Sequence, residues 1–226
     1  MSASDPAHNE RVVLASASIA RGRPRLHSDE EILDVALKAF AAQGYDAVSI
    51  RSLNAGLGLS HGTISQRFGT KQRLYFAAVE HGFVSFFAEI EQERQAAAVS
   101  REDMSDLAEL RILVLSFLLA AWKRPELGRL MNQEGLEQTD RLEFIIDLVF
   151  KPVIAMLDDL LGRLEAARAI RRTSRRSLFF LVAHGAEAPF TLTALSQSFD
   201  GIDGPLDPKA HAEAITDLIM AGLTSP

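Results

Sequence analysis

The chain has 226 residues, of which 47% are hydrophobic and 24% are charged, a balance typical of a globular protein with a sizeable core. It contains no cysteine, which excludes a disulfide scaffold, a Cys-ligated zinc site and a thiol nucleophile. The net charge of −6 argues mildly against a protein that coats nucleic acid without selectivity.

Residues 1–27 are rich in Ser, Ala, Gly, Pro and Arg without lasting periodicity, so we predict a disordered basic arm. No signal peptide is recognisable in it, and we expect a cytoplasmic protein. The most apolar stretch, Ile112 to Trp122, has eleven residues, whereas a membrane-spanning helix needs about 20. This stretch predicts a buried core helix and no membrane association.

The first helix is expected from Ser28, which has capping-box spacing to Glu31, to Gly44, which suits the position just after a helix. Apolar residues recur between them at helical intervals. Three more helices are predicted before residue 100, each behind an N-cap candidate (Ser49, Ser60 or Thr70): 50–57, 60–68 and a long one reaching into the 90s.

The rest of the chain keeps helical spacing, and no stretch alternates as a strand does. Pro125 and Pro208 suit the first turn of a helix. Pro152 falls inside a predicted helix and should kink it. The predicted helices cover 103–123, 125–134, 139–169, 174–199 and 207–223.

Two short helices joined by a turn at Gly58 form a helix-turn-helix if their apolar positions meet. Gly58 supplies the positive φ that such a turn needs. The small core would consist of Leu53, Leu57, Leu59, Ile64 and Phe68.

The charge pattern of this segment agrees with DNA binding. Residues 21–81 carry eight Lys and Arg against six Asp and Glu, and no acidic residue occurs from Ala47 to Val79. Carboxylates in such a stretch would repel a phosphate backbone, so their absence suits a surface that faces DNA. Chance depletion in a short window is the alternative.

The segment resembles the DNA-binding signature of the tetracycline-repressor (TetR) family, and the likeness covers about residues 28–80. Residues 32–45 also match the first helix of that family closely. The signature is matched at Ser49, Leu53, Gly58, Leu59, Ser60, Gly62, Thr63, Phe68, Lys71 and Leu74.

Three positions depart from the signature. Asn54 replaces a small Ala and needs a hydrogen-bond partner, without which it costs roughly 1–3 kcal/mol. Ser65 replaces a Tyr that contacts phosphate in the family, and Arg67 stands where His is common. The last two suggest a changed operator sequence.

The resemblance implies that Ser49 and Lys71 contact phosphates and that Arg51 reaches a base edge or a phosphate. The third helix and the turn before it would supply further DNA contacts: Ser60, His61, Gly62, Thr63, Ser65, Gln66 and Arg67. The residue types suit this role, since Arg pairs with guanine, Gln with adenine, and Thr contacts the thymine methyl. Each residue taken alone is equally compatible with a solvated helix face.

The arm contains Arg21, Arg23 and Arg25 in an Arg-Gly-Arg-Pro-Arg run that resembles a minor-groove-binding AT-hook. An extended Arg-Pro segment fits the narrow minor groove of A·T-rich DNA. A solubilising basic tail is the alternative.

Residues 81–226 contain large apolar side chains that form either plain core or the wall of an effector cavity: Phe87, Phe117, Trp122, Met131, Phe144, Leu148 and Phe180. His184 and Glu187 interrupt an apolar run and are predicted to orient a small apolar effector. The last two predicted helices are rich in small residues, including Ala186 and Ala214. In the family, two such helices per subunit form the interface of a homodimer.

No Gly-rich phosphate loop, Gly-x-Ser-x-Gly elbow or His-Glu-x-x-His motif occurs in the sequence. His184 and Glu187 form a single reversed His-x-x-Glu pair, which is too little for a di-iron bundle. We therefore predict a protein that is not an enzyme, with no catalytic residues, no metal and no cofactor.

The expected fold is all-α, with a helix-turn-helix domain over 28–80 and a helical ligand-binding and dimerisation domain over 81–226. The expected function is that of a ligand-responsive transcriptional regulator, namely a repressor. It would bind palindromic operator DNA as a homodimer and be released by an effector. The alternative is a helical small-molecule-binding protein whose degenerate helix-turn-helix no longer binds specific DNA.

Overall fold

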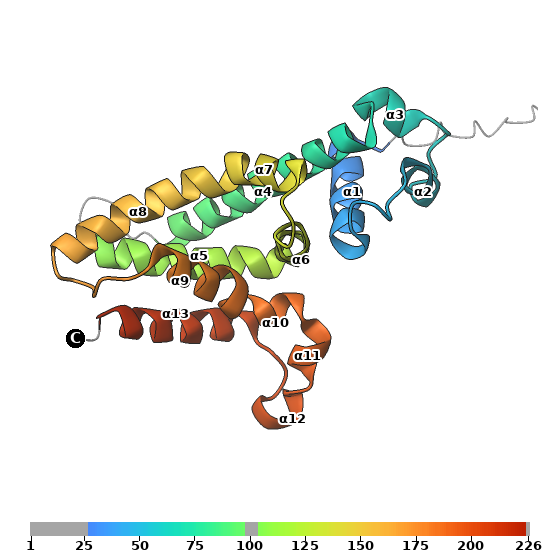
Figure 1. Cartoon of the computed structure of the whole chain (residues 1–226). Coiled ribbons are helices and arrows are strands. Elements are labelled where there is room, and N and C mark those ends of the chain that lie inside the picture. The colour runs from blue at the N-terminus through green and yellow to red at the C-terminus, as the bar shows by residue number, and fades with distance from the viewer. Residues whose placement is uncertain (1–26, 98–103, 225–226) are drawn as a thin grey trace, which may run out of the picture.

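The computed structural model describes residues 27–97 and 104–224, and every regular element in these two ranges is a helix. The all-α prediction is therefore confirmed. Figure 1 shows an elongated molecule with α1, α2 and α3 at one end, from which α4 runs into a larger helical part. The first four helices are α1 (Asp29–Gln43), α2 (Ile50–Gly56), α3 (Thr63–Phe68) and α4 (Lys71–Ala97).

The first helix begins and ends where its capping residues predict. The Ser28 side chain accepts from the backbone N–H of Glu31 at 3.1 Å, and the Glu31 carboxylate accepts from the N–H of Ser28 at 2.9 Å. These two bonds satisfy backbone groups that the helix itself leaves unpaired. Gly44, at a φ of 80°, ends the helix.

The recognition helix α3 is shorter than predicted. We expected Ser60 to cap it, but the helix begins at Thr63, and Gly62 occupies the N-cap position at a φ of 93°. A residue in this left-handed conformation cannot belong to a right-handed helix, so the preceding residues form a turn. The Ser60 hydroxyl instead lies 2.7 Å from that of Thr63.

The larger part contains α5 to α13, and the predicted helix over 125–134 matches α6 at both ends. Pro208, which follows the capping residue Asp207, begins the final helix as predicted. Its elements are α5 (Asp106–Lys123), α6 (Pro125–Glu134), α7 (Asp140–Ile145), η2 (Ile146–Phe150), α8 (Lys151–Ala166), α9 (Arg175–Phe180), η3 (Leu181–Ala186), α10 (Ala188–Thr191), α11 (Thr193–Gln197), α12 (Asp200–Asp203) and α13 (Pro208–Thr224).

Two of these elements, η2 and η3, are π-helical turns, and each lies just before a proline. η2 precedes Pro152 and η3 precedes Pro189. Proline lacks an N–H and its ring clashes with the carbonyl four residues earlier, so a widened turn relieves both problems. The predicted disturbance at Pro152 takes this form. The single helix predicted over 174–199 was wrong, because the structure breaks it into α9, η3, α10 and α11.

Helices α4, α5 and α8 run roughly along the long axis, α13 packs against α5, α10 packs against α6, and α11 and α12 project away from the body (Figure 1). Helix α1 packs against both α4 and α6 and so joins the helix-turn-helix to the larger part. In the described ranges, no helix combines the length and hydrophobicity that crossing a bilayer would take.

Gly82 of α4 lies where these three helices meet. A Cβ at this position would lie 2.5 Å from Cδ2 of Leu37 in α1 and 3.2 Å from Cδ2 of Leu127 in α6. Leu37, the nearer of the two, is fully buried, so its side chain has little free space to move into. The absence of a side chain at Gly82 therefore allows α1 and α6 to pack closely on α4.

We predict that Gly82→Ala lowers the free energy of unfolding by about 1–3 kcal/mol, because the added methyl group overpacks this junction. Thermal unfolding followed by circular dichroism measures the change. The matched control is Gly162→Ala in α8, where a Cβ meets nothing within 4 Å. That control should be neutral or stabilising. Equal stability of the two variants would contradict the role of Gly82.

Candidate DNA-binding face and ligand cavity

Helices α2 and α3 pack through the predicted small core. Leu53 and Ile64 are buried, and Leu57, Leu59 and Phe68 pack against them half-buried. Gly58 has the expected positive φ, at 62°. The five residues thus hold the two helices in the arrangement of a helix-turn-helix.

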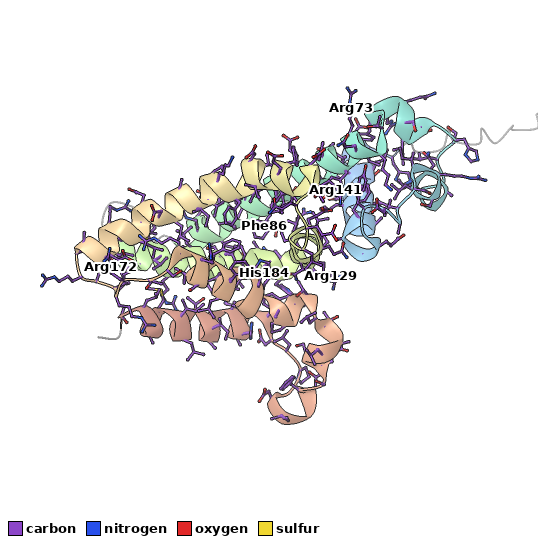
Figure 2. All side chains as sticks on the ribbon, viewed as in Figure 1. Arg73, Phe86, Arg129, Arg141, Arg172 and His184 are labelled. Atoms are coloured by element: carbon purple, nitrogen blue, oxygen red, sulfur yellow. The ribbon has the colours of Figure 1, made fainter. Side chains whose placement is uncertain are left out.

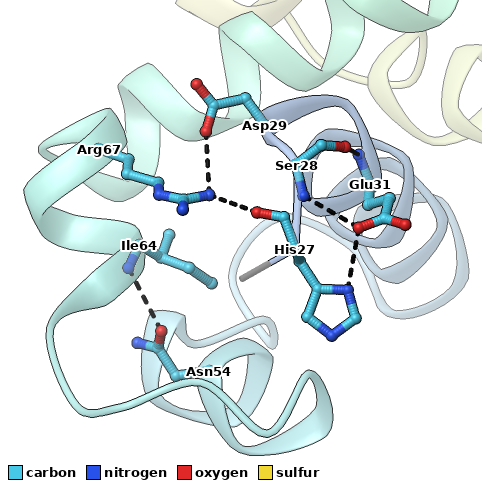
Figure 3. Close-up of polar contacts among 7 residues, drawn as sticks. All are labelled: His27, Ser28, Asp29, Glu31, Asn54, Ile64 and Arg67. Carbon is cyan, nitrogen blue, oxygen red and sulfur yellow. Dashed lines mark hydrogen bonds and ion pairs between the residues drawn. The ribbon is translucent and has the colours of Figure 1, made fainter. Parts of the chain in front are cut away.

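Asn54, the polar residue in the middle of α2, is only 3% exposed. Its side-chain oxygen accepts a hydrogen bond from the backbone N–H of Ile64 at 3.3 Å (Figure 3). This N–H lies in the first turn of α3, where the helix provides no acceptor. The buried amide therefore has the partner that its position requires, and it connects the two helices.

Most of the residues predicted to contact DNA lie on the surface. Ser49, Arg51, His61, Ser65 and Gln66 are exposed, as is Ser60. Gly62 and Thr63 are half-buried at the start of α3. Ser49 also caps α2, since its hydroxyl accepts from the N–H of Ser52 at 3.0 Å. The exposed groups from α2 and α3 thus lie in one acid-free segment of the chain.

Arg67 and Lys71 instead make contacts within the molecule. The Arg67 guanidinium donates to the backbone carbonyl of His27 at 2.7 Å and pairs with the Asp29 carboxylate at 3.1 Å (Figure 3). Lys71 donates to the carbonyl of Asp46 at 3.1 Å, and its ammonium lies 4.5 Å from the centroid of the Tyr45 ring. Arg67 therefore ties α3 to the start of α1, a contact that the sequence did not indicate.

The structure adds one basic residue to this face. Arg73 is exposed in the first turn of α4, at the end of the molecule that carries α3 (Figure 2). The sequence could have indicated Arg73 as a DNA contact, because it lies in the segment from Ala47 to Val79 that has no acidic residue. Arg21, Arg23 and Arg25, predicted for the minor groove, lie outside the described residues.

A cavity of about 430 Å³ lies inside the larger part, between α4, α5, α6, η2, α8, α9 and η3. Figure 2 shows Phe86 and His184 on helices that border it. Of the predicted effector-site residues, five line it: Phe87, Phe117, Met131, His184 and Glu187.

The other four lie elsewhere. Trp122 borders a separate surface hollow and packs on Phe190, while Phe144 stacks on Phe76 at a centroid distance of 4.4 Å. Phe180 is 55% exposed, and Leu148 does not reach the cavity. Unpredicted residues line it in their place, among them Phe150 and Phe179. Helical spacing alone does not decide which of two adjacent phenylalanines faces inward.

Glu187, directly after η3, carries the cavity's most unusual group. It is 3% exposed, and its Oε1 has no hydrogen-bond partner. A Cβ at Gly128 of α6 would lie 2.9 Å from Cδ of Glu187 and closer still to Oε1, so this glycine leaves the room that the carboxyl occupies. Burial raises the pKa of the Glu187 carboxyl to about 7.

His184 lies one turn before Glu187. Its Nδ1 lies 2.7 Å from Oδ1 of Asn132 in α6, and its ring stacks on Phe180 at 5.1 Å. Burial lowers the pKa of His184, which favours the neutral imidazole. Among the described residues, no His, Asp and Glu side chains gather in the groups of three that would hold a metal ion.

Two arginines connect the cavity region to the helix-turn-helix. Arg124 pairs with Glu89 of α4 at 3.0 Å and with Asp34 of α1 at 3.5 Å. Arg141 binds both carboxylate oxygens of Glu134 at 3.0 Å, and its guanidinium lies 4.4 Å from the Tyr45 ring centroid. Ion pairs and ring contacts thus supplement the apolar packing between the two parts.

Residues 32–78 match the family model described as bacterial regulatory proteins, tetR family. The segment from α1 into α4 is therefore similar to the DNA-binding part of the tetR family. The matched segment runs from the first buried residue of α1 into α4, and so contains the whole helix-turn-helix.

Two curated proteins similar to this chain are repressors. It is 33% identical over 89 residues to the HTH-type transcriptional repressor AcnR of Corynebacterium glutamicum, which covers 39% of this chain and 47% of that protein. It is 38% identical over 74 residues to the HTH-type transcriptional repressor Rv1474c of Mycobacterium tuberculosis, covering 33% and 35%. The chain therefore spans less than half the length of the curated relatives it matches.

Solved structures share the fold over nearly the whole chain. The ketosteroid transcriptional regulator KstR2 of Mycobacterium tuberculosis superposes with a TM-score of 0.65 and 17% identity, covering 89% of this chain and 98% of that one. At this identity the likeness establishes the arrangement of the helices alone, including those that follow the helix-turn-helix.

We predict that Glu187→Gln removes the pH-dependent loss of folding stability that the buried Glu187 carboxylate causes. The folded state raises the pKa of Glu187 from 4.5 to about 7, so it favours the neutral acid. Stability from this group is therefore present below pH 4.5 and is lost as the pH rises to about 7. Across this interval, the unfolding free energy of the wild type should fall relative to the variant by about 3 kcal/mol.

Urea unfolding at several pH values measures this difference. Glu137→Gln, at an exposed position after α6, is the control and should follow the wild type at every pH. Parallel pH profiles for the Glu187→Gln variant and the wild type would show that this carboxyl titrates normally.

Proposed function

We propose that this chain is a DNA-binding transcriptional regulator of the tetR family, a repressor that acts as a homodimer on palindromic operator DNA and is released by a small-molecule effector. The observation that carries DNA binding is the exposed face of α2 and α3 within a segment that lacks acidic residues from Ala47 to Val79. The proposed domains are a basic arm over 1–27, a DNA-binding domain over 28–80 and a ligand-binding and dimerisation domain over 81–226.

In this proposal α3 enters the major groove with its N-terminal end near the base edges. Gly62 and Thr63 would approach closely, and Gln66 is long enough to reach an adenine. Arg51 and Arg73, exposed on either side, would contact the phosphate backbone or, for Arg51, a base.

A helical small-molecule-binding protein with a degenerate helix-turn-helix is the second candidate. Its basis is that Asn54 and Ser65 depart from the DNA-binding signature of the family. The hydrogen bond between Asn54 and Ile64 favours an intact motif, because the polar residue supports the packing of α2 on α3. Ser65 remains the residue in its favour, since it is too short for the phosphate contact of the family's Tyr.

Effector binding would act through helices that the two domains share. Phe83, Phe86 and Phe87 of α4 line the cavity, as do Leu127 and Met131 of α6. Helix α1 packs on both α4 and α6. A ligand that shifts α4 would change the separation of the two α3 helices, which must match major grooves about 34–36 Å apart.

The proposed dimer interface lies on α13 and the segment around α9 to α12. Leu218 of α13 is 68% exposed, and Ile202, Phe199 and Leu195 also present large apolar side chains to the surface. These exposed apolar side chains support an interface here, because large exposed apolar patches mark interaction sites. Ala214 is exposed as well, whereas Ala186 is buried within the subunit, so only the former suits an interface test.

We predict that Gln66→Ala weakens binding to a selected operator by about 1–3 kcal/mol and relaxes discrimination at one base pair. Arg51→Ala should lower the salt dependence by about one unit if Arg51 contacts phosphate, and change base preference if it reads a base. Gel shifts at several salt concentrations measure both. Lys71→Ala is less suitable, because it also removes the contacts with Asp46 and Tyr45.

The control for DNA binding is Gln138→Ala, at an exposed position between α6 and α7, which should not alter affinity. Unchanged operator affinity in both the Gln66 and Arg51 variants would favour the degenerate-motif alternative.

We predict that the wild type sediments as a dimer at about 10 μM and that Leu218→Arg gives monomers, because it places a charge in the apolar interface. Operator affinity should fall with it, since one α3 holds only a half-site. Ala166→Arg, exposed at the end of α8, is the control and should remain dimeric. A monomeric wild type would refute the homodimer.

A further inference from the structure

The cavity contains four carboxylate or guanidinium side chains, and both of its arginines already have partners. Arg94 lies 3.8 Å from Glu91 and 3.6 Å from Glu109. Arg124 lies 3.0 Å from Glu89 and also pairs with Asp34. Because these carboxylates balance both guanidinium groups, an anionic ligand would have to displace an existing ion pair.

Glu187 is different. Among the described residues, no donor reaches its buried Oε1, and the neighbouring His184 uses its Nδ1 for the contact with Asn132. A buried carboxyl without a partner costs free energy, which a bound donor or cation would recover. Gly128 leaves room for the carboxyl in the cavity wall, since a Cβ there would overlap it.

The remaining wall is strongly aromatic. Phe86 packs edge-to-face on Phe117 at a centroid distance of 5.5 Å, and Phe150 packs on Phe179 at 5.0 Å. The faces of aromatic rings carry partial negative charge and attract cations. Six phenylalanines line the cavity: Phe83, Phe86, Phe87, Phe117, Phe150 and Phe179.

We infer that the cavity binds a hydrophobic monocation, a primary alkylammonium or arylalkylammonium ion whose charged head pairs with the Glu187 carboxylate and whose tail lies among the phenylalanines. This inference rests on the proposed function in one respect, namely that the cavity is the effector site. It refines the expected apolar effector by giving it a charged end.

Three ligands with one tail and different heads test the inference: n-decylammonium, n-decanol and n-decanoate. Calorimetric titration of the full chain at about pH 8 keeps the Glu187 carboxyl, with a pKa of about 7, ionised and the amine protonated. Decylammonium should bind at least about tenfold more tightly than decanol, as expected for one charge-assisted hydrogen bond, and decanoate should bind most weakly.

Glu187→Gln should remove the preference for decylammonium over decanol and leave decanol binding within about twofold of the wild type, because the amide has nearly the same size. The control Glu137→Gln, exposed and remote from the cavity, should keep the preference. Thermal unfolding of both variants checks that they are folded.

Tighter binding of decanol or decanoate than decylammonium to the wild type would overturn the inference, as would no decylammonium binding up to about 1 mM. An undiminished preference in Glu187→Gln would also overturn it. These outcomes are separate from failure of the proposed function. If the chain shows no preference for the cation but still binds operator in gel shifts, only this inference fails. If it binds decylammonium but no operator, this inference holds and the proposed regulator function fails.

Discussion

Helices α1, α4 and α6 meet where Gly82 brings no side chain between Leu37 and Leu127. The remaining structure depends on this close approach. Helix α4 connects the helix-turn-helix to the cavity, because it packs against α3 and its middle lines the cavity. Helix α1 packs on both α4 and α6, which border the cavity, so these contacts connect the cavity walls to the helix-turn-helix.

The cavity combines two features that reduce stability, empty volume and an unpartnered buried carboxyl. Both are unfavourable in a plain core, where apolar side chains would fill the space and no charge would be buried. Gly128 and Glu187 lie against each other in its wall, and the lack of a side chain at Gly128 makes room for the carboxyl. Such departures from good packing are expected at functional sites, because a ligand can compensate them.

Polar contacts on the inner side of α3 fix the orientation of the candidate DNA-binding face. Arg67 reaches Asp29 and the carbonyl of His27, and Asn54 reaches the backbone of Ile64. These bonds orient α3 relative to α1 and α2 without using its outward side chains. Gln66 and Ser65 remain exposed, and on this face they are available for an external partner.

The sequence by itself determined the features that depend on neighbouring residues. The capping pair of Ser28 and Glu31, the turn glycine at 58 and the start of α6 at Pro125 act within one or two helical turns, so the helix-turn-helix and most helix ends were predictable. The start of α3 was misplaced because Gly62 adopts a left-handed conformation that Ser60 did not reveal.

Only the tertiary structure decided which distant residues meet. It placed Asp29 against Arg67, Gly128 against Glu187, and Phe179 rather than Phe180 in the cavity. The first two pairs are 38 and 59 residues apart in the chain, and helical periodicity carries no information on such contacts. The π-helical turns also shift the faces of the helices that follow them, so the inward side of a broken helix follows from packing and not from spacing.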